Sequence, residues 1–148
     1  MKILIVFDTA YGNTEQIARA IGASLGTEVR TLRAGEADIS ALEGVELLAV
    51  GSPTQGGRPT QPVRDFLRKI PKSRLAGVKV AAFDTRVPAK WVGVFGFASG
   101  RIEDELKKKG GMPAVPHESF FVDGTKGPVT QGELERAGNW LKAVTGAK

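Results

Sequence analysis

The sequence contains no cysteine, which excludes disulfides, cysteine-ligated iron–sulfur clusters and catalysis by a thiol. Its single histidine, His117, excludes a metal site built from several histidines. No apolar run approaches the roughly 20 residues that a helix needs to cross a membrane. Only five apolar residues separate Lys2 from Asp8, whereas a secretory signal has an apolar segment of about 7–15 residues. We therefore expect a cytoplasmic protein without a membrane span.

The composition is that of an ordinary globular protein. A length of 148 residues suits one domain, residues 1–148, and the hydrophobic fraction of 41% is typical. The net charge is +5 and the isoelectric point is about 9.7. A basic chain favours an acidic partner or an anionic substrate, although a solvated surface of mixed charge has the same composition. No aromatic residues interleave with the basic ones, so we expect no specific nucleic-acid binding.

Apolar runs alternate with helical patterns along the chain. We expect strands at residues 3–7, 28–32, 45–50, 78–83 and 115–122. Helices are expected from about Thr14, after Thr60 or Gln61, before Gly110 and after Thr130, with a weaker helical stretch over residues 37–44. Five strands alternating with helices predict an α/β fold, with a parallel sheet covered by helices on both faces.

The last expected helix has the clearest start signal. Residues 130–133 read Thr-Gln-Gly-Glu, which is the spacing of a capping box. The inward face of this helix is expected to carry Leu134, Ala137, Leu141 and Val144. Trp140, beside Leu141, is interpreted as a packing residue.

Three loops follow the carboxyl ends of expected strands and are rich in glycine, proline and hydroxyl side chains. They span residues 8–13, 52–59 and 84–96. In an open parallel sheet, ligands bind beyond the carboxyl ends of the strands, at the point where the strand order reverses. These loops therefore predict a binding site.

The first loop favours a phosphate group. Thr9, Asn13 and Thr14 can form hydrogen bonds, and Gly12 lets the backbone approach a ligand closely. The N-terminus of the following helix adds unpaired amides and a partial positive charge. Helix capping alone would account for one of the two threonines. The loop has neither a Gly-x-Gly-x-x-Gly nor a Gly-Lys-Ser/Thr sequence, and it has no cation to neutralise a triphosphate, which favours a monophosphate.

These motifs resemble the flavodoxin family and flavodoxin-like FMN-binding domains. The run Thr9-Ala10-Tyr11-Gly12-Asn13-Thr14 is similar to the family's phosphate loop, residues 51–59 to its second flavin loop, and residues 83–86 to the start of its third. The resemblance covers essentially the full chain and looks like the short-chain type. It implies a flavodoxin-like three-layer fold with strand order 2-1-3-4-5, noncovalent FMN, and electron transfer between redox partner proteins.

The resemblance also implies which residues bind the cofactor. They are Thr9, Ala10, Tyr11, Gly12, Asn13 and Thr14 in the first loop, Pro53, Thr54, Gln55, Gly56 and Gly57 in the second, and Asp84, Thr85, Arg86 and Trp91 in the third. No catalytic or metal-ligating residue is implied. Gln55 stands where family members often carry tryptophan, and Trp91 is the best aromatic candidate in the third loop.

Charge is a second departure from the family, whose typical members are acidic. Arg58, Arg86 and Lys90 fall in the expected flavin loops. Cations attract the negative charge of reduced flavin. We therefore expect a less negative midpoint potential than in acidic relatives, and redox partners that are acidic.

Two other functions stay open. The first is a flavodoxin-like flavoenzyme that uses NAD(P)H or quinones, such as a reductase or a protoporphyrinogen-oxidising enzyme, because the small Gln55-Gly56-Gly57 segment would leave room for a second ring. The second is a flavodoxin-fold binding module without FMN, which the missing aromatic residue at position 55 favours.

Overall fold

The computed structural model describes residues 1–26, 28–88 and 97–146. Its strands are β1 (Ile3–Phe7), β2 (Val29–Arg33), β3 (Leu47–Pro53), β4 (Lys79–Arg86), β5 (Met112–Pro113) and β6 (Glu118–Phe121). Its α-helices are α1 (Asn13–Ala23), α2 (Gln61–Lys69), α3 (Ala98–Lys108), α4 (Glu133–Trp140) and α5 (Lys142–Thr145). There are also two 3-10 helices, η1 (Ala34–Glu36) and η2 (Ile39–Leu42), and η2 lies within the expected weakly helical stretch 37–44.

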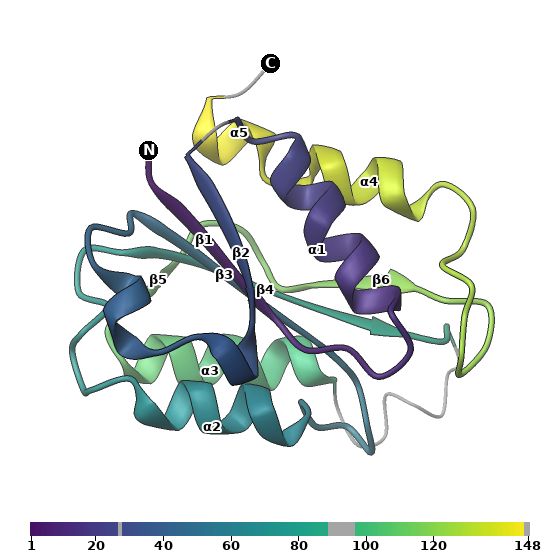
Figure 1. The fold of residues 1–148 in the computed structure, drawn as a ribbon, viewed down its shortest axis with the longest axis horizontal. Helices are drawn as coiled ribbons and strands as arrows, with labels where there is room; N and C mark the ends of the chain where they lie inside the picture. Colours follow the sequence, from purple (N-terminus) through teal and green to yellow (C-terminus); the bar gives the residue numbers. More distant parts are fainter. Residues whose placement is uncertain (27, 89–96, 147–148) are drawn as a thin grey trace.

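All strands pair in parallel, in the order β2-β1-β3-β4-β5, with β6 also paired to β4. The predicted strand order and the three-layer α/β architecture are therefore confirmed. Figure 1 shows α1, α4 and α5 on one face of the sheet and α2 and α3 on the other. The strand β2 lies at an edge and is only partly buried, as its more polar sequence suggests.

The expected fifth strand, residues 115–122, is present only as β6, and a separate short strand, β5, precedes the expected range. Pro113 of β5 pairs with Val80, and Glu118 of β6 pairs with Phe83. Two residues of β4 thus face the four residues 114–117. Pro116 lies in this interruption, and proline has no N–H with which to continue a ladder.

Two apolar cores lie on opposite faces of the sheet because successive side chains of β1 point in opposite directions. Leu4 and Val6 belong to the core beneath α2 and α3. Ile3, Ile5 and Phe7 belong to the core beneath α1 and α4. All five side chains are buried, as expected for a strand between two helical layers.

A close contact between β3 and β4 fixes the level at which the strands end. Gly51 pairs with Phe7 on one side and with Phe83 on the other. A Cβ atom on Gly51 would lie only 2.1 Å from Cζ of Phe83, so the phenyl ring occupies the space that a side chain at position 51 would need. The first residues of all three ligand loops therefore begin at the same edge of the sheet.

The expected capping box of the last helix does not form, and the prediction is wrong. The N-cap of α4 is Gly132, and Thr130 donates its hydroxyl hydrogen bond to Asp123. Glu133 reaches across to β6 and accepts a hydrogen bond from the amide of Phe121 at 2.8 Å. A hydrogen-bond partner on a neighbouring strand has replaced the local one.

The inward face of α4 differs at one position from the expected set. Leu134 is 42% exposed, whereas Ala137 and Leu141 are fully buried. Because α4 begins at Glu133, whose side chain turns inward, the next residue points toward solvent. Trp140 packs edge-on against Phe83 and Phe120, with ring centroids 5.8 and 5.6 Å apart, and its packing role is confirmed.

Within the described ranges, none of the helices has both the length and the apolar character needed to span a bilayer.

Candidate functional site

An open pocket of about 250 Å³ lies at the carboxyl ends of the strands, beside the N-terminus of α1. It is lined by Thr9, Ala10, Tyr11, Asn13, Thr14, Pro53, Thr54, Gln55, Gly56, Gly57, Thr85, Arg86, Val87, Val122 and Thr125. The three loops singled out in the sequence therefore meet at one pocket. The loop after β6 contributes a fourth wall.

The first loop enters α1 through a glycine in the left-handed region. Gly12 has φ of 91° and is the N-cap, and its amide donates to the Thr9 hydroxyl at 2.8 Å. The first helical hydrogen bond runs from the amide of Gln16 to the carbonyl of Gly12 at 3.1 Å. The amides of residues 13–15 precede this bond, so the helix itself does not use them. They form a ready site for an anion.

Two buried hydroxyls join the first loop to the third. The Thr14 and Thr85 hydroxyl oxygens lie 2.8 Å apart, and the two residues are only 1% and 4% exposed. A pair of hydroxyls has two protons, and their mutual hydrogen bond uses one of them. The second proton can be donated to a ligand in the pocket, which both residues line.

The second loop is a tight turn that projects over the pocket. Gln55 and Arg58 exchange two backbone hydrogen bonds of 2.9 and 3.0 Å. Gly56 and Gly57 between them have positive φ values of 58° and 78°, the combination typical of a type I′ turn. The backbone therefore favours glycine at both positions, whatever their role toward a ligand.

Side chains on neighbouring elements hold this turn in place. The amide of Thr54 donates to the carbonyl of Thr85 at 3.0 Å, and its hydroxyl accepts a bond from the amide of Ala98 at 3.0 Å. Arg101 of α3 donates from Nε to the carbonyl of Gly57 at 2.7 Å. The turn is thus tied both to β4 and to α3.

Arg86 is the one charged side chain among the described residues that line the pocket. Its guanidinium carbon lies 3.9 Å from the ring centroid of Phe97 and 5.0 Å from that of Phe121. Nε donates to the Ser119 hydroxyl at 3.1 Å, and Nη1 donates to the carbonyl of Val87 at 3.2 Å. These contacts hold a planar cation at the wall of the pocket.

The loop after β6 packs against the first loop. A Cβ atom on Gly127, whose φ is 105°, would lie 2.6 Å from Oδ1 of Asn13, so only glycine permits this approach. Lys126 places Nζ 5.9 Å from the ring centroid of Tyr11. A cation therefore stands at the rim of the pocket near the first loop, although none occurs within that loop itself.

Two of the predicted site residues that the structure describes, Gly12 and Asp84, do not line the pocket. Gly12 shapes the first loop without lining the pocket. Asp84 is fully buried below the pocket, where Oδ2 accepts a bond from the amide of Ser99 at 2.9 Å. Its Oδ1 has no hydrogen-bond partner among the described residues. Trp91 and Lys90 lie outside the described residues, so their contacts stay predictions.

Sequence reasoning missed Val87, Val122 and Thr125, which also line the pocket. Val87 lies within the expected third loop, directly after the predicted site residue Arg86, and Val122 ends the expected last strand. The carboxyl end of that strand lies at the same edge of the sheet as the others. The rule that ligands bind beyond the carboxyl ends of parallel strands, applied to the last strand as well, could have predicted that Val122 and Thr125 line the pocket.

The pocket fits a ligand with an anion at one end and a planar group at the other. The unused amides of α1 and the Thr14–Thr85 hydroxyls suit the anion. The segment 53–57 and the residues Thr85 to Val87 lie side by side and supply lining for a flat group. Tyr11, which is 53% exposed, is the one aromatic lining residue in the described part of the chain.

A partly exposed ion pair, in which the Arg136 side chain is 39% exposed and that of Glu133 11%, supports the wall formed by β6. Arg136 lies 2.6 Å from Glu133, measured from Nη2 to Oε2, and 3.3 Å from Glu118. The hydrogen bond from Arg136, followed by that from the amide of Phe121, holds the pKa of Glu133 below its usual value of 4.5, against the opposing effect of burial. The Glu133 carboxylate therefore anchors α4 to the strand that precedes Val122.

The family model described as flavodoxin matches residues 5–129. Among solved structures, oxidised Flavodoxin 2 from Bacillus cereus has a TM-score of 0.81 and 27% identity, with 97% of each chain covered. A flavodoxin from the domain Archaea has a TM-score of 0.78 and 20% identity, covering 99% of this chain and 97% of the other. A short-chain flavodoxin associated with a non-canonical PDU bacterial microcompartment has a TM-score of 0.79 and 18% identity over 100% of both chains. The last two likenesses concern the fold alone. The comparison with curated proteins gives no match.

The Glu133 anchor predicts a stability that depends on pH. Glu133→Gln is expected to lower the free energy of unfolding by about 1–3 kcal/mol near neutral pH, because the amide of Phe121 and the Arg136 guanidinium lose a charged acceptor. Since the folded-state pKa of Glu133 is lowered, its contribution is present above about pH 4.5 and is lost as the pH falls through the folded pKa. The difference between variant and wild type, measured by urea denaturation, should therefore shrink in acid.

Glu135→Gln is the matched control, because Glu135 is exposed on the same helix. It should change the free energy of unfolding by less than about 0.5 kcal/mol. Equal losses in the two variants, or a Glu133→Gln loss that is the same at all pH values, would contradict the anchor.

Proposed function

Because the chain belongs to the flavodoxin family, we propose that it binds FMN noncovalently in the strand-end pocket and carries electrons between redox partner proteins. The observation that carries the proposal is the first loop. It combines the unused amides of α1 with the Thr14–Thr85 hydroxyl pair at one end of the pocket. The cytoplasmic location and the acidic partners expected from the sequence belong to the same proposal.

The first loop would hold the phosphate of FMN. The amides of residues 13–15 and the hydroxyls of Thr9 and Thr14 are its donors, and the positive end of the α1 dipole attracts its charge. Lys126, whose Nζ lies 5.9 Å from the ring centroid of Tyr11, adds attraction from the rim. This donor set suits a single phosphate, which needs no metal ion.

The second and third loops would hold the flavin ring. The segment 53–57 and the residues Thr85 to Val87 are neighbours, joined by the bond from the amide of Thr54 to the carbonyl of Thr85, and both line the pocket. Arg101 and Thr54 keep the turn over the pocket from moving, through their bonds to Gly57 and Ala98. A fixed wall orients a bound ring and keeps water from one of its faces.

Bound FMN supplies the redox chemistry, because its ring accepts and releases electrons. The charges of the protein around the ring set the midpoint potential of the bound FMN. The Arg86 guanidinium is held rigidly by Phe97, Phe121 and Ser119, so its positive charge is fixed at the pocket wall. A fixed cation favours the reduced state of a neighbouring group that gains negative charge on reduction. Arg58, by contrast, is exposed and points its charge away from the lining.

Thr14→Val is expected to weaken FMN binding by about tenfold or more, because it removes a hydroxyl that bonds to the ligand's charged phosphate. Titration of FMN fluorescence measures the dissociation constant. Riboflavin lacks the phosphate, so its affinity should change far less in the same variant. Thr60→Val is the matched control, since the Thr60 hydroxyl is buried, has no hydrogen-bond partner among the described residues and lies outside the pocket. A wild-type protein that does not quench FMN fluorescence would refute the proposal.

Arg86→Gln is expected to lower the midpoint potential of bound FMN by an amount on the order of tens of millivolts, because it removes the fixed charge at the pocket wall. Arg86→Lys keeps the charge and should keep most of the potential. Arg58→Gln removes an equal charge from outside the lining and should shift the potential less. Redox titration of the three flavin-loaded variants gives the comparison, and a larger shift for Arg58→Gln than for Arg86→Gln would contradict it.

The second candidate is a flavoenzyme that uses NAD(P)H or a quinone. It is favoured by the second loop, where Gln55 and Gly56 are exposed and carry no ring over the pocket. Consumption of NADPH by the flavin-loaded protein with a quinone as acceptor would support this candidate. A carrier consumes none until a reductase partner is added.

A further inference from the structure

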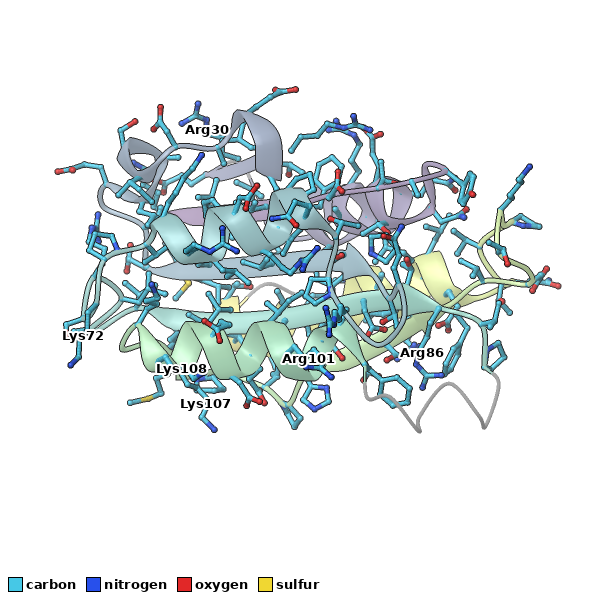
Figure 2. All side chains as sticks on the ribbon, turned by 90° about the horizontal axis from the view of Figure 1, so that it is seen from below. Arg30, Lys72, Arg86, Arg101, Lys107 and Lys108 are labelled. Carbon is cyan, nitrogen blue, oxygen red and sulfur yellow. The ribbon has the colours of Figure 1, made fainter. Side chains whose placement is uncertain are left out.

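A basic groove runs between α2 and α3, on the face of the sheet opposite α1. Its volume is about 530 Å³. Six cationic side chains line it, together with only two carboxylates, those of Asp104 and Glu105: the cations are Arg58, Arg64, Arg68, Arg101, Lys108 and Lys109. Figure 2 views this face and shows Arg101 and Lys108 along the same helix, α3.

Two cations of the basic groove, Arg68 and Lys108, form only exposed ion pairs within the protein. Arg68 pairs with Asp65 at 3.1 Å, and Lys108 pairs with Glu105 at 3.1 Å, but the two cationic side chains are 71% and 69% exposed. Ion pairs between such exposed side chains contribute little, so a partner's carboxylates can replace them. Nε of Arg64 is buried and has no hydrogen-bond partner among the described residues. The groove therefore keeps an excess of positive charge.

The basic groove and the strand-end pocket share a wall. Gly57 lines the pocket, and the next residue, Arg58, lines the groove. Arg101 of the groove donates from Nε to the carbonyl of Gly57 at 2.7 Å. A molecule seated in the groove would thus lie directly behind the turn that covers the pocket.

We propose that the basic groove is the docking surface for an acidic patch on an electron-transfer partner protein, an inference that rests on the proposed function. The planar guanidinium groups of arginine match the two oxygens of a carboxylate, and four of the six cations are arginines. Complementary charge guides the encounter and fixes its orientation. Docking behind the shared turn brings the partner close to the bound cofactor.

The groove is less suited to a nucleic acid. None of the described residues that line it is aromatic, and single strands bind largely by stacking on aromatic side chains. The helices that form it have 9 and 11 residues, which corresponds to a length of about 14–17 Å. This length suits an acidic segment of a few residues.

The test is binding of a fluorescently labelled oligoglutamate to the full chain, followed by anisotropy at low salt, both without and with FMN. The variant Arg68→Glu/Lys108→Glu reverses one charge on each wall. The control Arg30→Glu/Lys72→Glu makes the same change in net charge at two exposed positions outside the groove (Figure 2). The groove variant should bind the peptide at least about tenfold more weakly than the control. Circular dichroism of both proteins checks that the fold is kept.

Equal weakening in the two variants would overturn the proposal, because the peptide would then sense only net charge. Tighter binding of an oligothymidylate of equal charge, with the same dependence on Arg68 and Lys108, would overturn it in favour of a nucleic acid. With reduced FMN bound, the oligoglutamate should also slow oxidation by ferricyanide, and an unchanged rate would overturn the position beside the cofactor. Peptide binding does not require FMN, so a failure of FMN binding would refute the proposed function separately.

Discussion

The parallel register of β1, β3 and β4 is the constraint on which the rest of the structure depends. It brings Phe7, Gly51 and Phe83 to one level across the middle of the sheet. The loops that follow must therefore start side by side, although they are separated by more than thirty residues of sequence at each step. The hydrogen bond between Thr14 and Thr85 then closes the first loop onto the third. Without this register, the hydroxyls and glycines of the three loops would be unrelated turn residues.

The turn at residues 55–58 lies between the strand-end pocket and the basic groove. Its glycines face the pocket, and Arg58 and the bond from Arg101 face the groove between α2 and α3. The charges follow the same division. The described pocket lining has one cation, Arg86, held by aromatic rings, whereas the groove has six cations at its surface. A half-buried, fixed charge acts on what is bound in the pocket, and exposed charges act on what approaches from outside.

The sequence predicted the features that depend on local pattern and on general rules of parallel sheets. The helical layers and the meeting of three loops followed from apolar runs and from the position of glycines and hydroxyls, and the strand order followed from the family resemblance. It could not predict features decided by neighbours distant in the chain. Glu133 has the spacing of a capping residue, but its carboxylate accepts a hydrogen bond from the amide of Phe121 on β6 and does not cap the helix. The pairing along β4 is interrupted between β5 and β6, where residues 114–117 lie beside only two residues of β4. The basic groove could not be predicted either, since the cations of α2 and α3 become neighbours only when the chain folds.

The side chain of Phe83 occupies the space that a side chain at position 51 would need, at the level where the ligand loops begin. In evolutionary terms, neither position can drift by itself: a larger residue at 51 demands a smaller one at 83, and the exchange must keep the strands at their spacing of about 4.8 Å. Substitutions at these two sites in related chains should therefore be correlated, even in chains whose ligand loops have changed.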